Sequence, residues 1–137
     1  MAGNLSVSAD IATSGMRVQA ERLKVIAQNM ANADSISTTP GGEPYRRQVV
    51  SFQNYVEKET GAEMVRVDKI VQEMSQFDKK YDPHHPGADA QGYVSLPNVN
   101  PLIEMTDMKE AQRAYEANMN MMKTARDMNS SVLDILK

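Results

Sequence analysis

Few side chains in this sequence have the types and spacing that catalysis or metal binding requires. The two histidines are adjacent, His84-His85, in a proline-rich stretch, and no cysteine or spaced third histidine accompanies them. Adjacent histidines in such a stretch seldom point toward one metal ion. The pair is therefore predicted to lie in an exposed loop, and no metal site or cofactor is expected.

Three carboxylates, Glu57, Glu59 and Glu63, are the other candidates for chemistry. A carboxyl group acts as a general acid near neutral pH only where burial raises its pKa. Nothing in the surrounding sequence indicates burial, so these side chains are predicted to be solvated. The phosphate-binding and nucleophile motifs GxxxxGK[ST], GxGxxG and GxSxG do not occur. The sequence thus predicts that the chain is not an enzyme.

The composition argues against nucleic-acid binding, cysteine chemistry and a membrane-spanning segment. The 137 residues include 15 Lys and Arg against 18 Asp and Glu, a net charge of −3. Proteins that neutralise phosphates carry excess positive charge, so no nucleic acid partner is expected, and Arg46-Arg47 is expected to form ion pairs at a subunit contact. The chain has no cysteine, which excludes disulfides and cysteine nucleophiles. No apolar run approaches the ~20 residues of a membrane span, and no secretory signal is visible.

The positions of glycine and proline divide the sequence into three parts. All 6 prolines lie between Pro40 and Pro101, and no glycine or proline follows Pro101. We therefore predict a mainly α protein with long N- and C-terminal helices and a small β-rich middle module. Residues 1–35 and 100–137 are expected to form a terminal-helix domain, and residues 36–99 the middle module with its loops.

Both terminal segments carry a heptad repeat of apolar or small residues, which predicts helices that pack as a coiled-coil-like pair. The first helix is expected from about Ser6 or Ser8 to Asn32, and the second from Asn100-Pro101 to the end. The N-terminal seam comprises Leu5, Ala9, Ala12, Met16, Gln19, Leu23, Ile26, Met30 and Ala33. The C-terminal seam comprises Met108, Ala111, Tyr115, Asn118, Met122, Ala125, Asn129, Val132 and Leu136.

A second stripe adjoins the C-terminal seam and consists of Ala114, Ala117, Met121, Thr124, Met128 and Ile135. An apolar surface this wide exceeds what one partner helix covers, and soluble monomers avoid leaving it wet. Neighbouring subunits are therefore expected, and a head-to-tail contact that does not close would generate a filament or tube. The residues predicted to form the assembly interface are Leu5, Ala12, Met16, Leu23, Ile26, Asn29, Met30, Asn32, Met108, Tyr115, Asn118, Met122, Met128, Val132 and Ile135.

The middle of the chain shows the alternation of apolar and polar residues that is typical of strands. Strands are expected at about residues 45–56, 64–71 and 92–96. A module of about 60 residues buries only a marginal core, so it is expected to be stabilised by packing against the helices or against other chains.

Several segments resemble a known family. Residues 28–35 (QNMANADS) are similar to the signature that ends the first helix of bacterial flagellar axial proteins. Residues 40–50 (PGGEPYRRQVV) and 88–100 (ADAQGYVSLPNVN), followed by Glu104-Met105, resemble the FlgC family of proximal rod proteins. Residues 113–118 (RAYEAN) are similar to a run in the last helix of that family. The resemblance spans nearly the whole chain.

The resemblance implies a structural subunit of the flagellar basal-body proximal rod, the axial drive shaft that transmits torque and encloses the export channel. It implies export through the flagellar type III export gate without a cleaved signal, and assembly in the periplasmic space with FlgB, FlgF, FlgG and FliE. The terminal helices would form the inner tube of the rod. Phe52 and Val56 have the spacing of a candidate export signal.

Two other classes remain open from the residues alone. A helical adaptor or chaperone would use the seams to bind a single partner in a stoichiometric complex. A small hydrolase would use the acidic middle or the histidine pair, and its activity would depend on His84 or Glu63.

Overall fold

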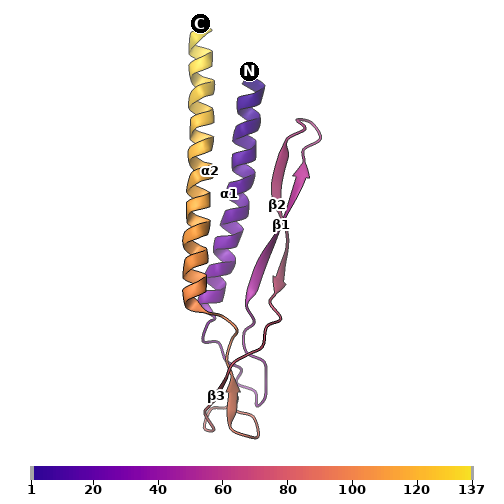
Figure 1. Ribbon diagram of the computed structural model, residues 1–137, viewed down its shortest axis with the longest axis vertical. Helices are drawn as coiled ribbons and strands as arrows, with labels where there is room; N and C mark the ends of the chain where they lie inside the picture. The colour runs from indigo at the N-terminus through magenta and orange to yellow at the C-terminus, as the bar shows by residue number, and fades with distance from the viewer. Residues whose placement is uncertain (1, 137) are drawn as a thin grey trace. The chain divides into compact units, whose positions relative to one another are not determined.

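The computed structural model describes residues 2–136 and contains two long helices and four strands (Figure 1). The order along the chain is α1 (Ala2–Ala31), β1 (Gln48–Val56), β2 (Glu63–Gln72), β3 (Lys79–Tyr81), β4 (Tyr93–Ser95) and α2 (Pro101–Ile135). Strand β1 pairs with β2 and β3 pairs with β4, so the described strands form two separate two-stranded sheets. The predicted fold class, with long terminal helices and a small β-containing middle, is confirmed.

The chain forms two compact units. Unit 1 comprises Met1–Leu23, Val50–Lys69 and Lys109–Lys137, and unit 2 comprises Lys24–Val49 and Ile70–Met108. Each unit combines residues of the terminal helices with residues of the middle segment. The sequence-based division into a terminal-helix domain and a middle module stays a prediction.

Helix α1 begins at Ala2, before the start that was predicted at Ser6 or Ser8. Serine favours helix N-caps when its hydroxyl oxygen accepts from a backbone N–H of the following turn. Here the Ser8 hydroxyl instead donates to the carbonyl oxygen of Asn4, at 3.0 Å. This local bond is compatible with a helix interior, so the helix continues through both serines.

The C-terminal end of α1 is closed by side chains that the sequence places directly after it. The helix ends at Ala31, next to the predicted end at Asn32. The Asn32 side-chain amide donates to the carbonyl oxygen of Gln28 at 2.8 Å, and the Ser35 hydroxyl donates to the Asn32 amide oxygen at 3.1 Å. The first bond gives a partner to a carbonyl group of the last helical turn, and the second holds the Asn32 amide in place.

Helix α2 begins at Pro101, where the sequence predicted it. The Asn100 amide oxygen accepts a hydrogen bond from the Leu102 N–H at 3.0 Å, which is the contact of an N-cap residue. Proline fits the first helical position because its missing N–H would have no partner inside the helix.

In unit 1, the β1–β2 hairpin closes over α1. The hairpin turn is held by the Glu57 N–H, which donates to the carbonyl oxygen of Ala62 at 2.8 Å, and Gly61 in this turn has φ 68°. The Val65 N–H on β2 donates to the Ser14 hydroxyl oxygen of α1 at 3.4 Å. Hydrophobic residues of the described chain that are buried in unit 1 include Ala12, Val18, Ala62, Ala111 and Ala125.

In unit 2, the short strands β3 and β4 pair antiparallel. Lys79 lies opposite Ser95, and Tyr81 lies opposite Tyr93. Strand β4 lies within the strand predicted at residues 92–96, and its Val94 is buried, at 2% exposed. Strand β3 was not predicted, because its three residues are all exposed and show no apolar alternation.

Candidate functional site and assembly surfaces

In unit 1, α1 and α2 lie side by side and antiparallel (Figure 1). The Thr13 hydroxyl on α1 donates to the Ala9 carbonyl oxygen at 2.8 Å, and its oxygen lies 3.7 Å from the Met122 sulfur on α2. At Gly15, a Cβ atom would lie 2.8 Å from the Asn118 Nδ2 atom, so the absence of a side chain lets the Asn118 amide rest on α1. Both contacts join C-terminal seam residues to α1 residues outside the predicted N-terminal seam, so the pairing of the two complete seams stays a prediction.

Two of the polar amides in the predicted seams have an oxygen without a hydrogen-bond partner in the described chain. The amide oxygens of Gln19 and Asn129 are buried and accept no hydrogen bond. The Asn118 amide donates to the carbonyl oxygen of Ala114 in its own helix, at 3.0 Å. Such amides lower the stability of a seam but disfavour other registers, because a shifted helix would place them against apolar residues.

Most residues of the predicted assembly interface are partly or fully covered by their own chain. The exceptions are Met128 and Ile135, which are 54% and 84% exposed. Whether any of these residues contacts a neighbouring subunit stays a prediction. The buried residues of the set are Ala12, Ile26 and Asn29, and the half-buried ones are Leu5, Met16, Leu23, Met30, Asn32, Met108, Tyr115, Asn118, Met122 and Val132.

In unit 2, the side chain of Asn29 joins the end of α1 to the start of β1 and to α2. Asn29 is 1% exposed, and its amide nitrogen donates to the Gln48 carbonyl oxygen at 2.8 Å and to Glu104 Oε2 at 3.2 Å. Its amide oxygen accepts from the Gln48 N–H and from the Tyr45 hydroxyl, both at 2.9 Å. The amide thus pairs with both backbone groups of Gln48, as a neighbouring strand residue would.

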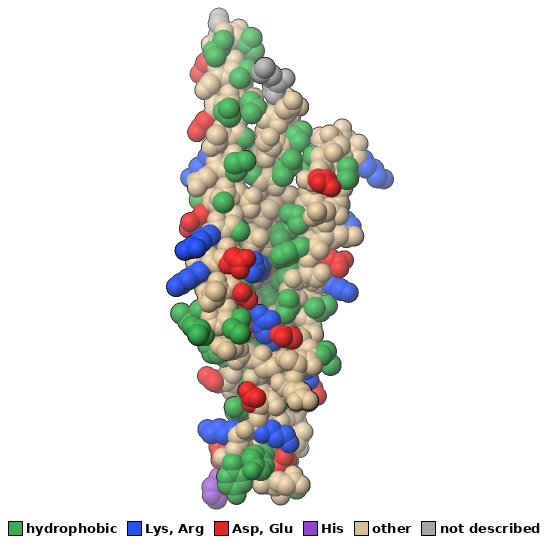
Figure 2. Space-filling model, in the orientation of Figure 1, with side chains coloured by type: hydrophobic (Ala, Val, Ile, Leu, Met, Phe, Trp, Pro, Cys, Tyr) green, Lys and Arg blue, Asp and Glu red, His purple; other side chains and the backbone are tan. Residues whose placement is uncertain are grey.

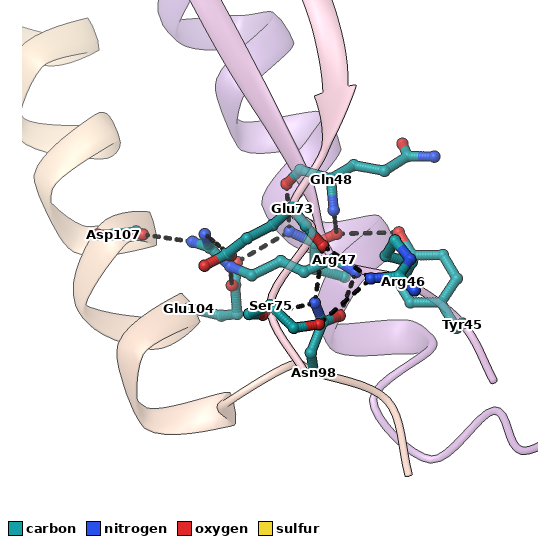
Figure 3. Close-up of polar contacts among 10 residues, drawn as sticks. Tyr45, Arg46, Arg47, Gln48, Glu73, Ser75, Asn98, Glu104 and Asp107 are labelled. Carbon is teal, nitrogen blue, oxygen red and sulfur yellow. Dashed lines mark hydrogen bonds and ion pairs between the residues drawn. The ribbon is translucent and has the colours of Figure 1, made fainter. Parts of the chain in front are cut away.

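Arg47 lies at the centre of an ion-pair cluster (Figure 3). Its guanidinium donates to the Glu104 carboxylate, to Glu73 Oε2 at 2.8 Å and to Asp107 Oδ2 at 3.2 Å. Its backbone N–H donates to the Asn98 amide oxygen at 2.7 Å. The ion pairs that were expected at a subunit contact therefore lie within unit 2 itself. Glu104 has 0% exposure, so its carboxylate depends on these partners.

Arg46 binds the same segment from another direction. Its guanidinium lies over the Phe77 ring, 4.2 Å from the ring centroid, and pairs with Glu43 at 3.6 Å. It also donates to the carbonyl oxygens of Glu73 and Ser75, at 3.3 and 3.2 Å. The two consecutive arginines thus hold residues 73–77 against the start of β1, a role that their spacing alone did not reveal.

The cluster shifts two pKa values. Burial, together with the charge of Glu104, raises the pKa of Tyr45 above its ordinary value. Burial lowers the pKa of Arg47, but the hydrogen bonds and charges of Glu104 and Glu73 outweigh this effect and raise it overall. These shifts favour a neutral phenol and a charged guanidinium, which is the state that the hydrogen bonds require. The cluster holds three segments together rather than presenting a reactive group.

The sequence pattern predicted Asn29 only as an assembly residue. It did not indicate that Glu104, Glu73 and Asn98 belong to the Arg47 cluster. The signal that could have pointed to Glu104 is its place in the first turn of a helix that follows an Asn-Pro pair. A negatively charged residue there has a favourable interaction with the helix dipole, and it lies close to the preceding loop.

The side chains that were considered for chemistry lie apart from this cluster. His84 is exposed, and His85 accepts a hydrogen bond from the Gly87 N–H at its Nδ1 atom, at 2.9 Å. Glu59 and Glu63 are exposed and Glu57 is half-buried at the β1–β2 turn. Within residues 2–136, no three His, Cys, Asp or Glu side chains gather where a metal ion could bind. No helix in that same stretch is both long and apolar enough to cross a membrane.

Unit 1 carries an open apolar surface on α2. The second stripe of the sequence analysis, here called the outer stripe (Ala114, Ala117, Met121, Thr124, Met128 and Ile135), is exposed except at the half-buried Ala114. Hydrophobic side chains reach the surface along α2 among charged ones (Figure 2). A groove of about 560 Å³ lies beside the stripe and is lined by Asn4, Leu5, Thr124, Asp127, Met128, Ser131, Val132 and Ile135.

Comparison with known proteins identifies the family to which this chain is related. Residues 90–135 match the family model of the C-terminal region of flagellar basal body rod FlgEFG proteins. The flagellar basal-body rod protein FlgC of Agrobacterium fabrum is 45% identical over 133 residues, covering 97% of this chain and 96% of that protein. The chain belongs to the FlgC family of flagellar basal-body rod proteins. The FlgC proteins of Borreliella burgdorferi (40% identical, covering 95% of this chain and 96% of that protein) and Bacillus subtilis (37%, covering 95% and 97%) agree.

Membership of the FlgC family identifies the chain as a component of the flagellar basal body that assembles with other rod components. The structure adds where the quoted motifs lie. The segment 28–35 and the pair Glu104-Met105 meet at the hydrogen bond between Asn29 and Glu104. The segment 40–50 supplies Tyr45 and Arg47 to the same cluster. In this chain, motifs far apart in the sequence therefore build one buried polar cluster.

A first prediction concerns the two asparagines of the segment 28–35. Asn29→Asp removes the donor to Gln48 and Glu104 and places a second carboxylate beside Glu104. We expect a loss of about 3 kcal/mol in the free energy of unfolding of the purified chain. The control Asn32→Asp, at the end of α1, is expected to cost about 1 kcal/mol or less. Equal losses in urea unfolding would contradict the role assigned to Asn29.

A second prediction concerns the pH dependence that Tyr45 confers. Because its pKa is raised in the folded chain, Tyr45 contributes stability that is present below the unfolded-state pKa of about 10 and is lost as pH rises through the higher folded value. Tyr45→Phe is expected to cost about 1 kcal/mol at neutral pH and to make unfolding less dependent on pH above about 10. Urea unfolding at several pH values measures both effects. Tyr55→Phe in unit 1 is the control, and an unchanged alkaline slope in Tyr45→Phe would refute the assignment.

Proposed function

We propose that the chain is a structural subunit of the proximal rod that polymerises into an axial shaft, transmits torque and encloses the export channel. The observation that carries this proposal is its similarity to FlgC rod proteins over nearly their whole length. The exposed outer stripe of α2 supports it, because a polymer covers an apolar surface that a monomer leaves wet.

The long helices are suited to a mechanical role. α1 has 30 residues and α2 has 35, which at 1.5 Å per residue is roughly 45 and 50 Å of continuous helix. We propose that these helices form the inner tube of the rod and that the other segments pack outside it. Bundled helices resist twisting because each contacts several neighbours along its length.

The partners in this proposal are FlgB, FlgF, FlgG and FliE, with further contacts between copies of the chain. The chain would pass the flagellar type III export gate before it assembles in the periplasmic space. Phe52 and Val56 remain the candidate export signal. Both lie on β1, 41% and 59% exposed, so their substitution is not expected to unfold the chain. The proposed action is assembly, and it uses no catalytic residue.

The first test is direct. Purified, detergent-washed hook–basal bodies from the source bacterium are analysed by mass spectrometry and compared with particles from a strain that lacks the gene. We expect the chain at several copies per particle, and no rod beyond the membrane ring in the deletion strain. Flagella that still form, with the chain absent from the particles, would refute the proposal.

A second test addresses the seam of unit 1. A charge introduced at Leu23 or Met122, as Leu23→Glu or Met122→Glu, is expected to abolish swimming while leaving expression intact. Both side chains are half-buried, and burying a charge there is costly unless it is paired. Lys123→Glu, at the exposed neighbouring position, is the control and is expected to swim normally. Normal swimming of the seam variants would contradict the seam assignment.

A further inference from the structure

Strand β1 pairs with another strand along one edge only, because its sheet has two strands in the described chain. The Glu57 N–H donates to the Ala62 carbonyl oxygen at 2.8 Å, so the backbone groups of odd-numbered residues in β1 point toward β2. The backbone groups of the even-numbered residues Phe52, Asn54 and Val56 therefore point away from β2. These three residues are here called the open edge.

Two other contacts agree with this assignment. The even-numbered Gln48, at the start of β1, binds the Asn29 side chain through both its N–H and its carbonyl oxygen. On the outer edge of β2, the Val65 N–H donates to the Ser14 hydroxyl oxygen at 3.4 Å. Residues of α1 cover both of these positions, whereas β1 ends on the side of the hairpin away from α1 (Figure 1).

The open edge is exposed and unprotected. Phe52 and Val56 are 41% and 59% exposed, and Asn54 is exposed as well. A row of unpaired backbone groups is a template for another strand, and proteins commonly block it with charged residues or proline. The 9 residues of β1 include no Lys, Arg, Asp, Glu or Pro, whereas β2 has charged residues at Glu63 and Arg66.

The contact at Gln48 shows how this edge can be filled. There the Asn29 amide donates to the carbonyl oxygen and accepts from the N–H, as the backbone of a neighbouring strand would. An added strand would make the same two bonds at each residue of the open edge. Its side chains would pack beside Phe52 and Val56, which share one face of the hairpin because an even number of residues separates them.

We propose that the open edge of β1 binds an extended segment of a neighbouring rod subunit, which joins the β1–β2 sheet as a third strand. In such strand addition the backbone hydrogen bonds supply affinity and alternate side chains supply specificity. The bound segment is expected to be uncharged beside β1 and apolar on the face of Phe52 and Val56. The inference rests on the proposed function, because it names a surface through which the chain joins its neighbours in the rod.

The added strand is not expected to be the β1 strand of a second copy. A contact between two open edges would use the same surface in both copies and would close after two subunits. A growing rod requires contacts that join different surfaces of successive subunits. The open edge therefore calls for a different segment of the neighbouring subunit.

The first test removes one outward N–H. Asn54→Pro deletes a donor of the open edge and no bond to β2, and proline is tolerated where a strand N–H faces solvent. We expect the number of copies in purified hook–basal bodies to fall on the order of tenfold, because the ring removes a hydrogen bond and obstructs the added strand. Asn54→Ala keeps the N–H, so this matched control is expected at the wild-type copy number.

Both variants leave Phe52 and Val56, the candidate export signal, unchanged. The amount of exported chain is measured in the same strains, so that a failure of export is distinguished from a failure of assembly. Asn54→Pro chain that is present at the wild-type copy number would overturn the proposal.

A second test uses the wild-type chain and does not depend on how a variant folds. Amide hydrogen exchange of residues 50–58, followed by mass spectrometry, is compared between the free chain and purified hook–basal bodies. We expect the amides of the open edge to exchange on the order of 100-fold more slowly in the particles, because a bound strand must open before they exchange. Equal exchange in both samples would refute the proposal.

A third test identifies the bound segment. A photoreactive amino acid at position 54 is activated in assembled particles, and the cross-linked peptides are sequenced by mass spectrometry. We expect one extended segment of a neighbouring rod subunit. Cross-links to position 54 of a second copy, or to helical segments alone, would contradict strand addition. Absence of the wild-type chain from the particles would refute the proposed function and this inference together, whereas its presence without these effects would refute the inference alone.

Discussion

The carboxylate of Glu104 is the group on which the packing of unit 2 depends, because it is fully buried and must be compensated by its neighbours. Arg47 supplies the opposite charge, and the Asn29 amide donates a further hydrogen bond. These residues come from the start of α2, from the turn before β1 and from the end of α1. One buried carboxylate thus fixes three segments that are far apart in the sequence, and removal of either partner leaves it only partly compensated.

Unit 1 is held together on a different basis. Its α1–α2 seam is lined by small residues, methionines and amides, and two amide oxygens in it have no hydrogen-bond partner in the described chain. Larger apolar side chains there would bury more surface, so this seam is not built for the greatest stability. The amides at Gln19, Asn118 and Asn129 instead make one alignment of the helices better than its competitors. A subunit of a rod needs a fixed alignment more than it needs a very stable monomer.

The elements that could be predicted from the sequence are those whose burial repeats along the chain. The heptads of α1 and α2 and the alternation in β1 and β2 are periodic, and their positions agree closely with the structure. Strand β3 is short and exposed and leaves no such pattern. The hydroxyl of Ser8 could have capped a helix or bonded within one, and the sequence alone does not distinguish these roles.

The Arg47 cluster could not be predicted for a related reason. Its members, among them Glu73, Asn98 and Glu104, are separated by long stretches of chain, and hydrogen bonds between such residues impose no spacing. The segments that contain several of them were quoted for their resemblance to a family, without a physical role. The structure supplies the role by bringing Asn29, Arg47 and Glu104 together.

The exposed methionines of the outer stripe make this surface sensitive to oxidation. Met121 and Met128 are exposed thioethers, which oxidants convert to sulfoxides that are polar and chiral. A sulfoxide at either position would place a strong hydrogen-bond acceptor on an otherwise apolar surface. The backbone would be unchanged. Buried alanines such as Ala111 and Ala125 in the seam carry no such liability. Oxidative damage would therefore reach the surface available to other chains before it reached the packing of the chain itself, and sulfoxide reductases could reverse it only while that surface remained open.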